Sequence, residues 1–350
     1  SYAFQGCSSL ASIEIPSSIT SIGSYAFQGC SSLASIEIPS SVTSIEEYVF
    51  DDCSLLASIE IPSSVTSIGD HAFSSCNSLA NIVIPSSVTS IGDYAFSSCN
   101  SLASIEIPSS VTSIGSSAFS GCSLLASIEI PSSITSIGDH AFSSCNSLES
   151  LTFGENSQLT SIGPSAFSGC SSLASIEIPS SVTSIGWGAF DGCSLLEIVI
   201  FEEGSQLTSI ELDAFNGCSS LASIEIPSNV TSIGERAFEG CSSLASIEIP
   251  GGVTSIGYRA FYDCSSLKSL EIPSSVTNIE QFAFFGCDSL KYIHITANTL
   301  TGDSRSLSGT WVKTDSADKP ISWTAGRVTS IPRRNSAGYY HQQSAWEKAN

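Results

Sequence analysis

One phrase recurs along the chain with a fixed period, and this repetition is the feature that most constrains the fold. Thirteen cysteines mark it, one at the same phase of every copy. Their spacing is 23 residues, except for two steps of 25 residues from Cys145 to Cys170 and from Cys193 to Cys218. A constant period of this length predicts stacked coils, each of which contacts only its neighbours, in place of one globular core.

The copy that begins at Cys30 shows how one coil is expected to fold. Ser35-Ile36-Glu37-Ile38 alternates with a period of two, which is typical of a strand with both isoleucines facing the interior. Pro39 is expected to end this strand because proline has no N–H to donate to a ladder.

The second half of a coil is illustrated by Ile91-Gly92 and the six residues that follow. We interpret the Ile-Gly pair as a bend in which glycine takes a positive φ. Residues 93–98 are predicted to form a single helical or 3₁₀ turn, which is too short to be stable alone.

Two columns of like residues are predicted to hold the stack together. A phenylalanine occupies the same phase in every copy from Phe4 to Phe284, and each buried ring contributes ~1.5–3 kcal/mol. The cysteines are odd in number and all in phase, so we expect buried free thiols, although coil spacing alone does not exclude pairing. Because they form no C-x-x-C pairs, no metal site is predicted.

Charge is distributed unevenly. Residues 1–296 carry 29 acidic and 4 basic side chains, whereas residues 297–350 carry 4 acidic and 7 basic ones. The acidic body argues against a nucleic-acid partner, because phosphate binding needs lysine and arginine. No apolar run approaches the ~20 residues of a membrane span. The chain begins inside a repeat, so we expect it to be a fragment or a processed chain, and the absence of a signal peptide says nothing about location.

The outward position between the two inward strand residues is the main candidate binding face. Most copies place glutamate there, while two later copies place apolar or aromatic residues on the same face. The candidate residues are Glu14, Glu37, Glu60, Glu106, Glu129, Glu177, Ile198, Ile200, Glu225, Glu248, Glu271, Tyr292 and His294.

This glutamate column has two interpretations. Gene duplication alone accounts for a solvated ladder, even though neighbouring carboxylates ~5 Å apart repel by roughly 1 kcal/mol in water. Alternatively, the column is an acidic face for a basic protein, a cationic surface or loosely held Ca²⁺. The Thr-Ser columns offer a weaker alternative, a hydroxyl array suited to carbohydrate or ice. Apolar Ile198 and Ile200, close in sequence to Trp187, mark either a contact site or drift in one copy.

No catalytic motif is present. The sequence contains neither G-x-S-x-G nor H-E-x-x-H nor a phosphate-binding G-x-x-x-x-G-K-[ST]. We therefore predict that the protein is not an enzyme and needs no cofactor.

The phrase from Leu79 to Cys99, Leu-x-x-Ile-x-Ile-Pro-x-x-Val-x-x-Ile-Gly-x-x-Ala-Phe-x-x-Cys with Val83 inside the strand, resembles the BspA-like leucine-rich repeat. The resemblance covers residues 1–296 and implies a right-handed solenoid, with a parallel sheet on the concave side and short helical or 3₁₀ turns on the convex side. Residues 297–325 are predicted to be an irregular insertion. Residues 326–350 resemble the family's C-terminal cap more loosely.

The same resemblance implies a function. Members of that family are associated with the cell surface or the extracellular space, and with adhesion and protein binding. We therefore expect a non-enzymatic scaffold that binds a protein ligand, or a host, cell-surface or matrix component, through its concave face. The alternative is a structural or matrix protein that self-associates through the ends of the solenoid.

Overall fold

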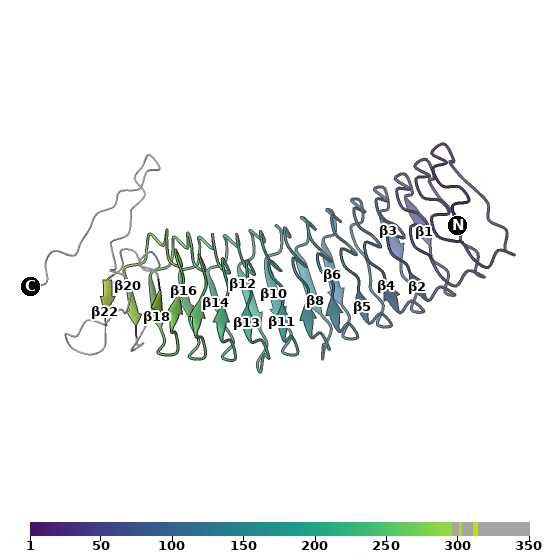
Figure 1. The fold of residues 1–350 in the computed structure, drawn as a ribbon. Helices are drawn as coiled ribbons and strands as arrows, with labels where there is room; N and C mark the ends of the chain where they lie inside the picture. The colour runs from purple at the N-terminus through teal and green to yellow at the C-terminus, as the bar shows by residue number, and fades with distance from the viewer. Residues whose placement is uncertain (296–300, 303–310, 314–350) are drawn as a thin grey trace, which may run out of the picture. The chain divides into compact units, whose positions relative to one another are not determined.

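The computed structural model describes residues 1–295, 301–302 and 311–313. The chain divides into two compact units, Ser1–Val182 and Thr183–Asn350, which are described separately below. In each unit, successive copies of the phrase form successive coils, and the strands pair in parallel with the period of the repeat (Figure 1). Each unit is therefore a parallel β-solenoid, as the period predicts.

The first strand ladder is built from the alternating Ser-Ile-Glu-Ile segments. In unit 1, β1 pairs with β3, and β6, β8 and β10 follow one another in register. In unit 2, β14 pairs with β16, and β18, β20 and β22 form a second run. The bounds are β1 (Ser58–Glu60), β3 (Asn81–Val83), β6 (Ser127–Ile130), β8 (Ser150–Phe153), β10 (Ser175–Ile178), β12 (Ile198–Phe201), β14 (Ser223–Glu225), β16 (Ser246–Glu248), β18 (Ser269–Ile272), β20 (Tyr292–Ile295) and β22 (Trp311–Lys313).

A second parallel ladder, which the sequence analysis did not predict, is formed by the Ser-Ile pair before each glycine. It is continuous from β2 to β9 in unit 1 and from β13 to β21 in unit 2. The bounds are β2 (Ser67–Ile68), β4 (Ser90–Ile91), β5 (Ser113–Ile114), β7 (Ser136–Ile137), β9 (Ser161–Ile162), β11 (Ser184–Ile185), β13 (Ser209–Ile210), β15 (Ser232–Ile233), β17 (Ser255–Ile256), β19 (Asn278–Ile279) and β21 (Thr301–Gly302). Strands of two residues lack the alternation by which a strand is recognised in sequence.

Stacked phenylalanines fill the core of both units. In unit 1, neighbouring rings from Phe4 to Phe167 lie 5.2–5.7 Å apart between centroids. In unit 2, the rings from Phe190 to Phe284 lie 5.4–5.5 Å apart. The rings from Phe50 to Phe261 are fully buried. The predicted aromatic spine is therefore confirmed.

The cysteines are free, and all except Cys7 are buried. Buried thiols donate hydrogen bonds to the carbonyl oxygen of a phenylalanine in the preceding coil. For example, Cys76 Sγ donates to Phe50 O at 3.1 Å. Burial raises the pKa of the Cys53 and Cys122 thiols to about 12. Cysteine thus serves here as a small apolar residue that also satisfies a backbone acceptor.

This arrangement predicts how many thiols react. A disulfide reagent at pH 8 should modify one thiol per chain in the native protein, Cys7, and all thirteen in denaturant, because reaction needs an accessible thiolate. Counting the released chromophore before and after denaturation checks this. Several fast-reacting thiols in the native protein would contradict the burial of the cysteine column.

Residues 93–98 and their equivalents in the other coils, which we call the turn segment, do not form the helical turn that was expected. Alternate N–H groups bond to different coils: those of Tyr25 and Phe27 donate to Glu47 O and Val49 O of the next coil, whereas that of Ala26 donates to Gly23 O of its own coil. In an α-helix, by contrast, each backbone N–H donates to the carbonyl oxygen four residues earlier in the same helix. Among the described residues the segment is therefore a succession of turns with no assigned helix.

Two positions of every turn segment take a left-handed φ. One is the column from Tyr2 through Tyr25 to Phe282, and the other is the residue before each cysteine. The second column is glycine in eight of its thirteen copies, which is where the conformational freedom of glycine is used.

The glycines of the Ile-Gly pairs have a different role from the one expected. At Gly115, an added Cβ would lie 2.5 Å from Gly92 C and 2.7 Å from Asp93 N of the preceding coil, and its φ is not positive. The same close approach of backbone recurs at Gly92 and Gly138. These glycines allow two backbones to touch, so the interpretation as positive-φ bends is wrong.

Parts of the predicted domain plan lie outside the described residues. Within 297–325, the structure describes Thr301–Gly302 and Trp311–Lys313, which pair in parallel with β19 and β20. The predicted cap, residues 326–350, is not described. Across the residues that are, no helix is long and apolar enough to cross a bilayer.

Candidate functional site

The outward side chains of the first ladder in unit 1 form one exposed face, which we call the glutamate face. Parallel pairing aligns them coil by coil: Glu37 with Glu60, and Glu60 with Val83. Farther along, Glu129 aligns with Thr152. The face consists of Glu14, Glu37, Glu60, Val83, Glu106, Glu129, Thr152 and Glu177, all of them exposed.

This face has no internal neutralisation. Residues 1–182 contain no lysine or arginine, whereas they contain fifteen aspartates and glutamates. Strands in a parallel ladder lie ~4.8 Å apart, so carboxylates on neighbouring coils are held at a separation that costs free energy. The glutamate face therefore carries an unpaired row of negative charge.

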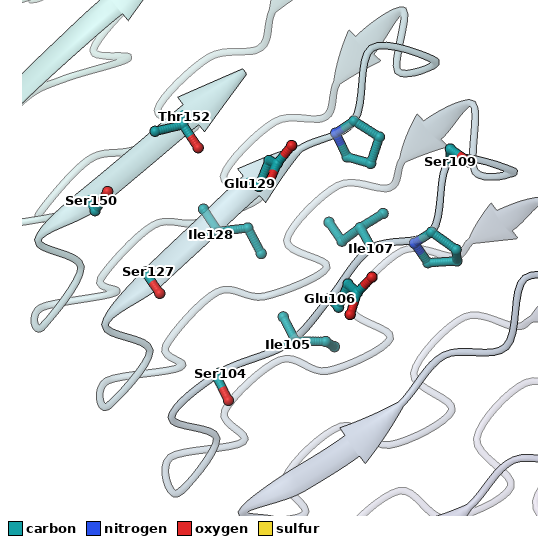
Figure 2. Close-up of a pocket in the computed structure, with 12 residues that line it drawn as sticks. Ser104, Ile105, Glu106, Ile107, Ser109, Ser127, Ile128, Glu129, Ser150 and Thr152 are labelled. Atoms are coloured by element: carbon teal, nitrogen blue, oxygen red, sulfur yellow. The ribbon is translucent and has the colours of Figure 1, made fainter. Parts of the chain in front are cut away.

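A shallow depression of about 530 Å³ lies on the glutamate face, across three coils (Figure 2). Glu106 and Glu129 occupy equivalent positions of two neighbouring coils, and Thr152 takes the same position on the third. Serine hydroxyls line the depression at the start of each of the three strand segments, and two prolines line it where two of these segments end. The lining residues are Ser104, Ile105, Glu106, Ile107, Pro108, Ser109, Ser127, Ile128, Glu129, Pro131, Ser150 and Thr152.

Three exposed apolar side chains lie on coils of unit 1, and one of them, Val83, lies on the coil before the depression. Val83 is 77% exposed and interrupts the glutamate column directly after Glu60. Leu55 and Leu124 are also about half exposed, at the residue two places after a cysteine. Sequence reasoning placed Val83 in the outward column but did not select it, because a single β-branched residue in a strand has no distinctive signal.

The predicted face residues of unit 2 also lie on the first ladder. Ile198 and Ile200, the outward residues of β12, are 50% and 49% exposed. Glu225, Glu248 and Glu271 are exposed on β14, β16 and β18. The outward column therefore continues through this unit, with isoleucine in place of glutamate at β12.

The other residues selected from the sequence are Tyr292, His294 and Trp187. Tyr292 and His294 align with Ser269 and Glu271 in the ladder, and only their backbone is described. Trp187 follows β11 in the turn segment, so it does not share the outward face of Ile198 and Ile200 despite their closeness in sequence.

Unit 2 neutralises part of its charge within itself. Arg236 pairs with Asp213 at 2.8 Å, and Arg259 approaches Glu239 at 3.6 Å while lying over the Tyr262 ring at 4.6 Å from its centroid. Desolvation by burial raises the pKa of Glu239, although Arg259 opposes this shift. Unit 2 therefore has ion pairs between arginine and acidic side chains, whereas unit 1 has no lysine or arginine to form them.

An aromatic strip on the turn segments of unit 1, which we call the tyrosine stack, was not predicted as a site. It consists of Tyr2, Tyr25, Tyr48, His71 and Tyr94, whose neighbouring ring centroids lie 4.3–4.8 Å apart with planes within 14°. The sequence shows these residues in one column, but stacking depends on the shared left-handed backbone at each of them.

The predicted hydroxyl ladder is used by the fold itself. Thr160 Oγ1 donates to Thr135 O of the preceding coil at 3.0 Å, and Thr89 Oγ1 donates to Thr66 O at 3.3 Å. These donors bond to backbone carbonyls, which leaves fewer of them for a ligand.

The lining of the depression contains carboxylates, hydroxyls, aliphatic side chains and prolines, and it contains no histidine, cysteine or lysine. No group of three or more potential metal ligands is found in the described part of the chain. The arrangement can bind cations and hydrogen-bond donors.

Comparison with known proteins gives a consistent result. The model of the BspA type leucine rich repeat region matches residues 1–124, 89–207 and 208–316. A leucine-rich repeat protein from Bacteroides ovatus is 33% identical with a TM-score of 0.76, over 90% of this chain and 86% of that one. A leucine rich cell surface protein from Faecalibacterium prausnitzii is 29% identical with a TM-score of 0.52, over 81% of this chain and 88% of that one. No curated protein matches the chain.

Proposed function

Because the chain belongs to the BspA-type leucine-rich repeat family, we propose that it is a non-enzymatic scaffold that binds basic proteins through the glutamate face. The observation that carries this proposal is an exposed, in-register row of carboxylates in a unit that has no lysine or arginine. A partner's cations would relieve the repulsion along this row, and complementary charge speeds association and selects partners.

The depression at Glu106 and Glu129 is the proposed centre of contact. Two carboxylates there are bordered by serine hydroxyls, which accept hydrogen bonds from lysine or arginine. Exposed Val83 lies on the neighbouring coil and supplies an apolar contact beside the charges. A ring of polar contacts around an apolar anchor is typical of protein interfaces.

A location at the cell surface or outside the cell fits this function. The support is the family and the similar protein from Faecalibacterium prausnitzii, which is described as a cell surface protein. Fractionation of cells that produce the full-length protein, with surface protease treatment, tests this location.

Neutralising two carboxylates of the glutamate face should weaken the binding of a basic probe. In the full chain, Glu106→Gln with Glu129→Gln is expected to reduce affinity for a nona-lysine peptide roughly threefold to tenfold, because two charge contacts are lost. Fluorescence anisotropy at low and at physiological salt measures the dissociation constant.

The matched control removes the same charge elsewhere in unit 1. Glu46→Gln with Glu155→Gln changes two exposed carboxylates that lie off the outward strand positions, and it should leave affinity almost unchanged. An equal loss in both variants would mean that only net charge matters, which contradicts a specific face. Sedimentation of the same samples shows whether self-association competes with peptide binding.

A further inference from the structure

The tyrosine stack is a pre-ordered strip on a different part of the coil from the glutamate face. Tyr94 is 41% exposed and Tyr2 is 56% exposed, while the three rings between them are half-buried. The ring of each member is held by its neighbours, so binding a partner there freezes few additional side-chain rotations.

The fold does not require tyrosine at these positions. Each of them has a left-handed φ between 53° and 63°, a conformation that is strained for a residue with a side chain. Gly188 occupies the same column in unit 2 without that strain. The core, moreover, is already supplied by the phenylalanine column, whose rings are fully buried from Phe50 onward.

Ring stacking offsets this strain but does not explain the hydroxyl groups. A stacked aromatic pair is favourable beyond the burial of its surface, and phenylalanine stacks as well as tyrosine. Phe282 occupies the same column in unit 2, which shows that the backbone accepts a ring without a hydroxyl. The phenol groups of Tyr25, Tyr48 and Tyr94 are therefore surplus to the fold.

The surroundings of the stack define which chemistry it fits. Because the ring faces cover one another, a partner meets ring edges and hydroxyl oxygens. Acidic residues border the stack: the N–H of Tyr25 donates to Glu47 O at 3.1 Å, and Gln28 Nε2 donates to Asp51 Oδ2 at 2.9 Å. Desolvation raises the pKa of Tyr25, and the charges of Glu47 and Asp51 raise it further. A guanidinium group can donate to a hydroxyl and a carboxylate at once through its planar fork, whereas an ammonium group is a single point charge.

We propose that the tyrosine stack is a second protein-interaction surface, which takes an arginine-bearing segment of a partner protein. The guanidinium groups donate hydrogen bonds to the tyrosine hydroxyl oxygens and pair with Glu47 and Asp51. Tyrosine and arginine are the residue types most concentrated at the energetic centres of protein interfaces. This surface is separate from the glutamate face, and the position of the cross-links described below distinguishes binding at one from binding at the other.

Removing the hydroxyls while keeping the rings tests the proposal. The variant Tyr25→Phe, Tyr48→Phe, Tyr94→Phe in the full chain preserves both stacking and net charge. Wild-type protein should bind a nona-arginine peptide more tightly than a nona-lysine peptide of equal charge. The variant should lose roughly tenfold in affinity for nona-arginine, through two or three lost hydrogen bonds, and little for nona-lysine.

A control variant and a cross-linking experiment make each outcome decisive. Tyr258→Phe with Tyr262→Phe repeats the substitution at two tyrosines of unit 2 that are not members of the stack, and it should change neither affinity. Equal affinities for both peptides in the wild type, or an unchanged nona-arginine affinity in the triple variant, would overturn the proposal. So would cross-links from a benzophenone-labelled nona-arginine peptide that map only to the glutamate face and not to the segment around Tyr48.

Discussion

Replacing Phe119 with alanine is expected to lower the free energy of unfolding by about 3–5 kcal/mol. The ring is fully buried and stacks on Phe96 and Phe142 at 5.3 and 5.2 Å, so its removal leaves a cavity between three consecutive coils. Neighbouring rings cannot close this cavity, because each is fixed by the next member of the column. In a stacked protein, such a loss weakens both adjoining interfaces.

Hydrogen exchange is the appropriate measurement, because repeat proteins do not always unfold in one step. The backbone amides of Phe96 and Phe119 donate across coils to Ala118 O and Ala141 O, at 2.7 and 2.8 Å. The amides at positions 96 and 119 should both exchange much faster in the variant. The matched control is Leu124→Ala in the same coil, a side chain that is 53% exposed and whose loss should change stability by less than about 0.5 kcal/mol. Similar losses in both variants would contradict a phenylalanine spine.

Adding a single methyl group at Gly115 is expected to cost about 2–3 kcal/mol. The new Cβ would meet Gly92 C and O at 2.5 and 2.6 Å, and these backbone atoms cannot rotate away as a side chain would. Three coils do accept glutamate in this column, Glu46, Glu211 and Glu280, so the backbones can separate at a cost and the variant should still fold.

Gly121→Ala is the control that separates close approach from conformational freedom. Gly121 has a φ of 74° and nothing nearer than 3.5 Å to an added Cβ, so alanine there should cost only about 1 kcal/mol of backbone strain. Urea titrations of both variants, followed by circular dichroism, give the comparison. If Gly121→Ala were the more destabilising change, the assigned role of Gly115 would be wrong.

Much of the fold could be predicted from the period alone. In-phase columns of isoleucine, phenylalanine and cysteine were assigned to the interior, and the structure buries them. The first 25-residue copy also keeps its phase: Ile130 aligns with Phe153, and Ser136 with Ser161, so its two extra residues bulge between β8 and β9. Because each coil repeats the same environment, one correctly interpreted copy fixes the inward and outward sides of the rest.

The candidate sites were predictable to different degrees. The glutamate face follows from strand alternation, since outward and inward residues are fixed once Ile36 and Ile38 are assigned to the core. The depression at Glu106 and the tyrosine stack depend on how adjacent coils pack against each other. Neither is contained in the pattern of one copy.

The sequence by itself determined that the chain winds into stacked coils, which columns face inward, and where a row of carboxylates meets solvent. These properties depend on side-chain polarity and period, which are local. Only the tertiary structure decided the second ladder, the conformation of the turn segments and the role of the Ile-Gly glycines. In each of these, the N–H groups or the backbone of one coil meet the backbone of the next, so the outcome depends on a neighbour 23 residues away and not on the residue itself.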